Sequence, residues 1–213
     1  VTLCGTGLCG YLGQDYVGQP AGAVFGKIAV PLLSDIPIIG SILFKQDALV
    51  YISYFLVPLA AWYFYKTRSG LFLRAMGENP AAVDAAGINV FGLRYLYIVI
   101  GGALAGVAGA YLSLAYAPSW LENMTAGRGW IAVALVIFAL WDPWRAMAGS
   151  YLFGGIDALG FNLQVLGVPV SGFILNMLPY IFTVLVLVLV LKRRGGRSAS
   201  PQALGLSYDR EER

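Results

Sequence analysis

The sequence predicts an all-α integral membrane protein, a polytopic helical bundle, because of its composition and its long apolar segments. Of the 213 residues, 59% are hydrophobic and only 12% are charged, whereas a soluble domain is roughly 25% charged. So few charges leave too little polar surface for water, and lipid is the alternative solvent. Several apolar runs also approach or reach the roughly 20 residues that a helix needs to cross a bilayer.

The residue types argue against metal chemistry and against nucleic-acid binding. The chain has no histidine, which removes the commonest metal ligand and the commonest general base near neutral pH. Cys4 and Cys9 are too few for a zinc site, and we interpret them as small buried apolar residues. The net charge of +3 is mild. We expect no metal, no cofactor and no nucleic-acid partner.

The apolar segments divide the chain into a transmembrane domain, residues 1–191, and a polar tail, residues 192–213, that we expect to be disordered. The first twelve residues are apolar but short, and no methionine precedes them. We therefore expect a fragment whose N-terminal helices are missing. The remaining segments are a loop at 13–46 with a short apolar piece at 36–44, spans at 47–66, 93–115 and 170–191, and two short apolar stretches at 129–141 and 146–161.

Positive charges predict which loops face the cytoplasm, since cytoplasmic loops are enriched in lysine and arginine. If successive spans cross the membrane in alternating directions, three places fall on the same side. These three places carry most of the basic residues. The basic residues are Lys66, Arg68, Arg74 and Arg94 around one loop, Arg145 at the turn between the short stretches, and Lys192, Arg193, Arg194 and Arg197 at the C-terminus. The loop and the C-terminus are therefore expected in the cytoplasm, and the loop at 118–128 outside.

Two glycine patterns imitate nucleotide-binding motifs. The stretch from Gly5 to Gly10 fits G-x-G-x-x-G, but it lies in a membrane segment rather than after a strand. Gly26-Lys27 resembles the end of a phosphate-binding loop, yet Ala21 stands where the earlier glycine is required. We conclude that an ATP-driven step would need another subunit. A different glycine pattern predicts close helix packing. It consists of Gly102 and Gly106, four residues apart, and of Ala105 and Gly109 at the same spacing.

The cytoplasmic loop contains a short helix signal. Asn79 is a good N-cap, Pro80 suits the first helical position, and Gly87 can end the helix in a left-handed conformation. A helix of about two turns is marginal on its own in water. It must be held by this protein's own surface or by a partner's groove, unless it is an ordinary connection between spans; the spacing leaves these readings open.

The outer loop and one buried acid are candidates for the solute pathway. Short, glycine-interrupted segments line pathways in transporters. The loop before residue 130 is therefore a candidate for the external opening of the solute pathway or for a docking surface. The alternative is a plain exposed loop. Asp157 is the one acid inside an apolar stretch, where carboxylates usually face a cavity or a partner. The alternative is that Asp157 lies near the membrane edge, where water solvates its carboxylate. The candidates are Glu122, Asn123, Thr125, Arg128, Trp130 and Asp157.

Three strings together resemble the permease family of branched-chain amino acid and ribose ABC importers. They are RAMGENPAAVDAAGI from Arg74, ENMTAGRGWIA from Glu122 and WDPWRAMAG from Trp141. Within that family the second string is most similar to permeases that work with nucleoside-binding lipoproteins. The resemblance covers residues 71–191, with a looser match before them.

The resemblance implies a type II ABC importer-like permease of the bacterial inner (plasma) membrane, acting on nucleosides or related small polar solutes. It implies cytoplasmic ATP-binding subunits, a second permease subunit and an extracellular substrate-binding lipoprotein as partners. Within loop 67–94, the residues implied to couple to the ATPase are Glu78, Asn79, Pro80, Ala81, Ala82, Asp84, Ala85 and Gly87.

Two other classes of protein are alternatives to an importer permease. A gradient-driven secondary transporter or channel needs ionisable groups deep in the bundle, and only Asp157 qualifies. A membrane enzyme needs a nucleophile and base or a metal cluster, and the sequence shows no such constellation.

Overall fold

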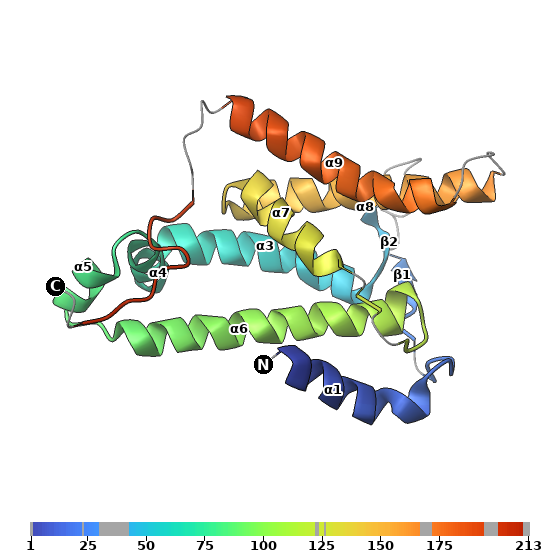
Figure 1. Cartoon of the computed structure of the whole chain (residues 1–213), viewed down its shortest axis with the longest axis horizontal. Coiled ribbons are helices and arrows are strands. Elements are labelled where there is room, and N and C mark those ends of the chain that lie inside the picture. Colours follow the sequence, from blue (N-terminus) through green and yellow to red (C-terminus); the bar gives the residue numbers. More distant parts are fainter. Residues whose placement is uncertain are drawn as a thin grey trace. The chain divides into compact units, whose positions relative to one another are not determined.

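The computed structural model describes residues 2–22, 24–29, 43–121, 124–125, 127–166, 172–193 and 200–210, most of them helical (Figure 1). The chain forms two compact units, Val1–Phe55 with Arg94–Ala126, and Leu56–Leu93 with Gly127–Arg213. The helices are α1 (Thr2–Gly13), α3 (Ala48–Lys66), α4 (Arg68–Glu78), α5 (Pro80–Ala85), α6 (Val90–Tyr111), α7 (Arg128–Ala139), α8 (Pro143–Val165) and α9 (Gly172–Arg193).

Two helices are long and apolar enough to cross a membrane. They are α3, with 19 residues, and α6 continued by the π-helical turn η2 (Leu112–Tyr116), with 27 residues in all. Both coincide with predicted spans. Only the described residues enter this assignment, and α7 is a shorter apolar helix. The helix α9 occupies the last predicted span and is 22 residues long.

The first unit contains structure that the predicted loop at 13–46 did not include. A 3-10 turn, η1 (Gln14–Tyr16), follows α1, and β1 (Lys27–Ala29) pairs antiparallel with β2 (Lys45–Asp47). The Tyr51 hydroxyl donates to the Ile28 carbonyl at 2.8 Å, which ties α3 to this ribbon. Most of the apolar piece predicted at 36–44 lies outside the described residues.

The helix at the apolar stretch predicted at 146–161 extends beyond that stretch at both ends, because α8 is a continuous helix of 23 residues. The carboxylate of Asp142 accepts a hydrogen bond from the Arg145 amide at 2.9 Å and so caps its start. Polar side chains inside it return to the helix backbone: Asn162 donates to the Ala158 carbonyl at 2.8 Å. Such local bonds let polar residues continue the helix.

In the second unit, α7, α8 and α9 pack against one another. Leu140 and Trp141, with φ of 57° and 58°, reverse the chain between α7 and α8. A β-carbon on Gly149 of α8 would lie 2.9 Å from the Phe138 ring of α7, so glycine permits this close approach. Across the other interface the rings of Phe153 and Phe182 meet edge to face at 5.5 Å.

Two sequence interpretations differ from the structure. Cys4 and Cys9 are exposed rather than buried, since no described segment covers that part of α1. The region around Gly102, Gly106 and Gly109 is equally open, because a β-carbon there would meet no described atom within 4 Å. The close helix packing that these glycines predict therefore stays a prediction, because none of the described helices packs against them.

Part of the tail at residues 192–213, for which disorder was expected, lies within the described residues. Lys192 and Arg193 belong to α9, and residues 200–210, which we call the tail segment, run beside α4 and α5 (Figure 1). Backbone hydrogen bonds from Leu204 to Pro201 and from Leu206 to Ala203 give it a folded-back course. The aromatic and charged side chains near its end supply the contacts described below.

Candidate functional site between α3 and α6

The candidate site is the inter-span segment, residues 67–89, which connects α3 to α6. Thr67 forms its first corner. The Thr67 hydroxyl donates to the Tyr63 carbonyl at 2.6 Å and accepts from the Gly70 amide at 3.0 Å. One side chain thus closes the last turn of α3 and caps the first turn of α4.

Gly70 makes this corner tight. A β-carbon at Gly70 would collide with the Tyr63 carbonyl oxygen and lie 2.7 Å from the Phe64 Cα. These are backbone atoms, which cannot rotate away as a side chain can. On the same corner the Arg74 guanidinium lies over the Tyr65 ring, 5.3 Å from its centroid, a cation–π contact. The start of α4 is therefore fixed to the end of α3.

The short helix predicted after Asn79 is present as α5, and both its ends are capped as predicted. The Asn79 side-chain oxygen accepts from the Ala82 amide at 3.1 Å, and Pro80 occupies the first turn. At the other end Gly87 has φ +81°. The Gly87 amide donates to Asp84 O at 2.9 Å and the Ile88 amide to Val83 O at 3.3 Å. This pair of bonds is the Schellman motif.

Burial separates the inner side of α5 from the outer side. Val83 is only 4% exposed, and Val90 at the start of α6 is fully buried. The residues Ala82, Ala85, Ala86 and Gly87 are exposed, as are Glu78 and Asn79 ahead of them. The segment thus presents a smooth surface of small side chains, held by a valine anchor on its inner side.

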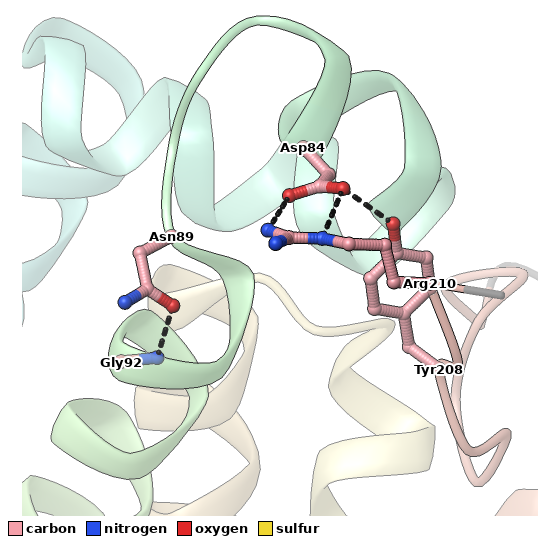
Figure 2. A network of polar contacts seen from close by, with 5 residues as sticks. All are labelled: Asp84, Asn89, Gly92, Tyr208 and Arg210. Carbon is pink, nitrogen blue, oxygen red and sulfur yellow. Dashed lines mark hydrogen bonds and ion pairs between the residues drawn. The ribbon is translucent and has the colours of Figure 1, made fainter.

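Asp84 is the charged group that the tail segment engages (Figure 2). Its carboxylate is 6% exposed. It accepts from the Tyr208 hydroxyl and from Arg210 Nε, each at 3.0 Å on Oδ2, while Arg210 Nη2 donates to Oδ1. The Asp84 carboxylate also raises the pKa of Arg210 above its ordinary value. The Arg210 guanidinium therefore stays charged at physiological pH.

The tail segment also contacts the helices on either side of α5. Its Ala203 amide donates to the Gly77 carbonyl of α4 at 2.9 Å. Its Tyr208 ring lies 5.9 Å from the Phe91 ring of α6. Asn89 caps α6 by accepting from the Gly92 amide at 3.0 Å (Figure 2). Between these elements is an open hollow of about 410 Å³, lined by Asp84, Gly87, Ile88, Asn89, Phe91 and Arg210.

The side chains around α5 hold a short helix in a fixed position. Among the described residues there is no cluster of three or more histidine, cysteine, aspartate or glutamate side chains that could hold a metal ion. The hydrogen-bonding groups around α5 cap helices or pair with each other, and none of them forms a nucleophile–base pair. The arrangement can fix the position of a small helix and present it to another surface.

The pathway candidates belong to other elements of the chain. Thr125 is exposed, Arg128 opens α7, and Trp130 is 78% exposed. Asp157 is half-buried on α8 and takes part in a polar or electrostatic interaction. Glu122 and Asn123 lie outside the described residues. A role for these residues in the pathway or in binding-protein docking stays a prediction.

Sequence reasoning missed Thr67, Gly70, Tyr208 and Arg210. Thr67 carried a usable signal, because threonine before an amphipathic stretch is a common N-cap. The close approach at Gly70 depends on the angle between two helices, which spacing does not give. Tyr208 and Arg210 lie in a polar tail with no periodic pattern, and their partner is more than a hundred residues away.

Comparison with known proteins defines the class. The model of the family described as "Branched-chain amino acid transport system / permease component" matches residues 3–191. This chain belongs to that permease family. No solved structure matches it.

Several relatives are named ABC transporter permeases. The chain is 39% identical to TsgC13 of Haloferax volcanii, named for glucose, over 99% of this chain and 71% of that protein. It is 41% identical to the nucleoside permease NupC of Lactococcus lactis, over 84% of this chain and 56% of that protein. It is 33% identical to the guanosine permease NupQ of Bacillus subtilis, over 91% and 59%. The chain thus spans between about half and three quarters of these relatives.

Proposed function

We propose that this chain is part of the membrane-spanning permease of an ATP-driven importer, and that α5 is the helix through which an ATPase subunit drives it. The observation that carries the proposal is α5 itself. It is capped at both ends, its Val83 side chain is buried, and its exposed surface consists mainly of alanines. It follows α4, which begins directly after α3, and a short link joins it to α6. Among the described residues, α3 and α6 are the helices long and apolar enough to span a membrane.

The family and the geometry support each other in this proposal. The relatives are named as permeases of ABC transporters, and such a permease needs a contact that relays ATP binding to the membrane helices. A two-turn helix is marginal alone, so the capping and the valine anchor favour a position held ready for a partner. A ligand or nucleotide shifts such a conformational equilibrium only through different contacts in the two states. The alanine surface of α5 would supply one such contact.

The solute that we propose is a nucleoside or a related small polar molecule. Relatives named for nucleosides and guanosine, and one named for glucose, support this range. The partners that we propose are cytoplasmic ATP-binding subunits, a second permease subunit and an extracellular substrate-binding lipoprotein. The inter-span segment and the C-terminus would face the cytoplasm of a bacterial inner membrane, as the basic residues around them favour.

A cross-linking experiment tests the contact and the orientation together. In the full-length protein, with Cys4 and Cys9 replaced by serine, Ala85→Cys should cross-link to the ATPase subunit in native membranes. The matched control is Thr125→Cys, which is also exposed but is expected on the other side of the membrane. Cross-linking of the ATPase to the control and not to Ala85→Cys would overturn the proposed orientation.

Reconstitution tests the energy source and the solute. The purified complex in vesicles should hydrolyse ATP faster when a binding protein loaded with guanosine is present, with ribose and glucose as comparison solutes. Uptake without ATP, driven by an ion gradient and abolished by Asp157→Asn, would instead support a secondary transporter.

A further inference from the structure

The tail segment contacts three successive helices at one place: α4 and α5 of the inter-span segment, and α6. It reaches α4 through the Ala203 amide on Gly77 O, α5 through Tyr208 and Arg210 on Asp84, and α6 through the Tyr208 ring on Phe91. Pro201 adds packing on α4, because a β-carbon at Gly77 would lie 3.2 Å from the Pro201 ring. These contacts come from one stretch of about ten residues.

The contact on Asp84 has the chemistry of a specific attachment. Arg210 binds both carboxylate oxygens, and such bidentate pairs fix direction as well as distance. The carboxylate is 6% exposed whereas Arg210 is 61% exposed, so the attachment shields the aspartate and leaves the arginine in water. Removing the arginine side chain would take away its two charge-assisted hydrogen bonds to the carboxylate.

The same contact leaves the outer surface of α5 uncovered. Ala82, Ala85 and Ala86 remain exposed with the tail segment in place. A segment that blocked the ATPase would have to cover these residues. A segment that fixes the orientation of α5 needs only to contact one side of it. Such a contact is needed because a helix of six residues is too short to keep its orientation by its own hydrogen bonds.

We propose that the tail segment positions α5 for coupling, with Tyr208 and Arg210 as positioning residues that act through Asp84. This proposal rests on the function proposed above for α5. The tail segment holds α5 against α4 and α6, so that a movement of α5 is passed to the membrane helices rather than lost in rotation of α5 alone.

The test uses the full complex in vesicles and compares basal with stimulated ATP hydrolysis. With Arg210→Ala, stimulation by the loaded binding protein should fall roughly threefold to tenfold, in line with the loss of a charge-assisted, bidentate bond. Basal hydrolysis, assembly of the complex and the solute concentration for half-maximal stimulation should not change. Arg210→Lys should restore only part of the stimulation, because an ammonium group cannot reproduce the two-pronged contact.

Two further variants separate positioning from general damage. Tyr208→Phe keeps the ring beside Phe91 and removes only the hydroxyl bond to Asp84, so it should give a smaller loss in the same direction. Leu204→Ala changes an exposed side chain of the tail segment that makes none of these contacts and should behave as the parent protein. If Arg210→Ala prevents assembly, Tyr208→Phe provides the measurement.

The outcomes distinguish this proposal from the proposed function. If no ATPase associates and the parent protein shows no stimulation, the proposed function fails. If the parent is stimulated and Ala85→Cys cross-links, but Arg210→Ala and Tyr208→Phe couple normally, the positioning role is wrong. If Arg210→Ala raises basal hydrolysis or tightens ATPase binding, the tail segment is an inhibitory cover and the positioning role is again overturned.

Discussion

Replacing Gly87 by alanine should loosen α5 by an amount that the structure allows us to calculate. Gly87 has φ +81°, and a β-carbon there would meet no atom within 4 Å. The substitution therefore causes no collision, and its cost is that of a left-handed conformation for a residue with a β-carbon, roughly 1–2 kcal/mol. This corresponds to a roughly 5- to 30-fold increase in the fraction of molecules whose helix end is open.

Hydrogen exchange of the detergent-solubilised protein measures this opening directly. The informative amides are those of Ala86, Gly87 and Ile88, which donate to carbonyls of α5, and they should exchange faster by that factor. Gly87→Asn should exchange at an intermediate rate, because asparagine tolerates the left-handed region better than alanine. The matched control is Gly101→Ala, at an open helical position without positive φ.

Equal protection of these amides in Gly87→Ala and Gly101→Ala would refute the reasoning. It would mean that the C-terminal cap does not hold α5 in the folded protein. An effect of Gly87→Asn as large as that of Gly87→Ala would also contradict it, since the penalty would then not come from the backbone conformation.

Three other predictions concern neighbouring features. Asn79→Ala removes the N-cap of α5 and should cost about 1 kcal/mol, seen as faster exchange of the Ala82 amide, whereas Asn79→Asp should not. Val90→Ala empties a fully buried position and should cost about 2 kcal/mol, measured as a lower melting temperature; an unchanged melting temperature would contradict the burial. The Arg145 amide and then the Tyr65 hydroxyl lower the pKa of Asp142. Its stabilising effect is therefore complete above the ordinary carboxyl pKa near 4 and is lost as the pH falls through the lowered value. Melting curves from about pH 5 down to about pH 2, across and below the ordinary carboxyl pKa, should show this loss in the parent and not in Asp142→Asn.

The sequence predicted the features that depend on local rules. The apolar runs located α3, α6 and α9, and Asn79, Pro80 and Gly87 located both ends of α5, because spans and caps are set by residues close together in the chain. The length of α8 was underestimated, since Gly154, Gly155 and Asp157 lower its hydrophobicity without breaking its hydrogen bonds. The attachment of the tail segment was missed, because a polar segment gains order only from partners distant in sequence, here Asp84 and Phe91.

Very few residues of the inter-span segment lie outside its helices. From Lys66 to Val90 the chain passes through α4 and α5 with only Thr67, Asn79 and residues 86–89 between helices, and these residues form caps. One residue added inside α4 or α5 would turn everything after it by about 100° and shift it by about 1.5 Å, moving Asp84 away from Arg210 and Val83 out of its buried site. The number of residues in this segment is therefore constrained as strongly as their identity.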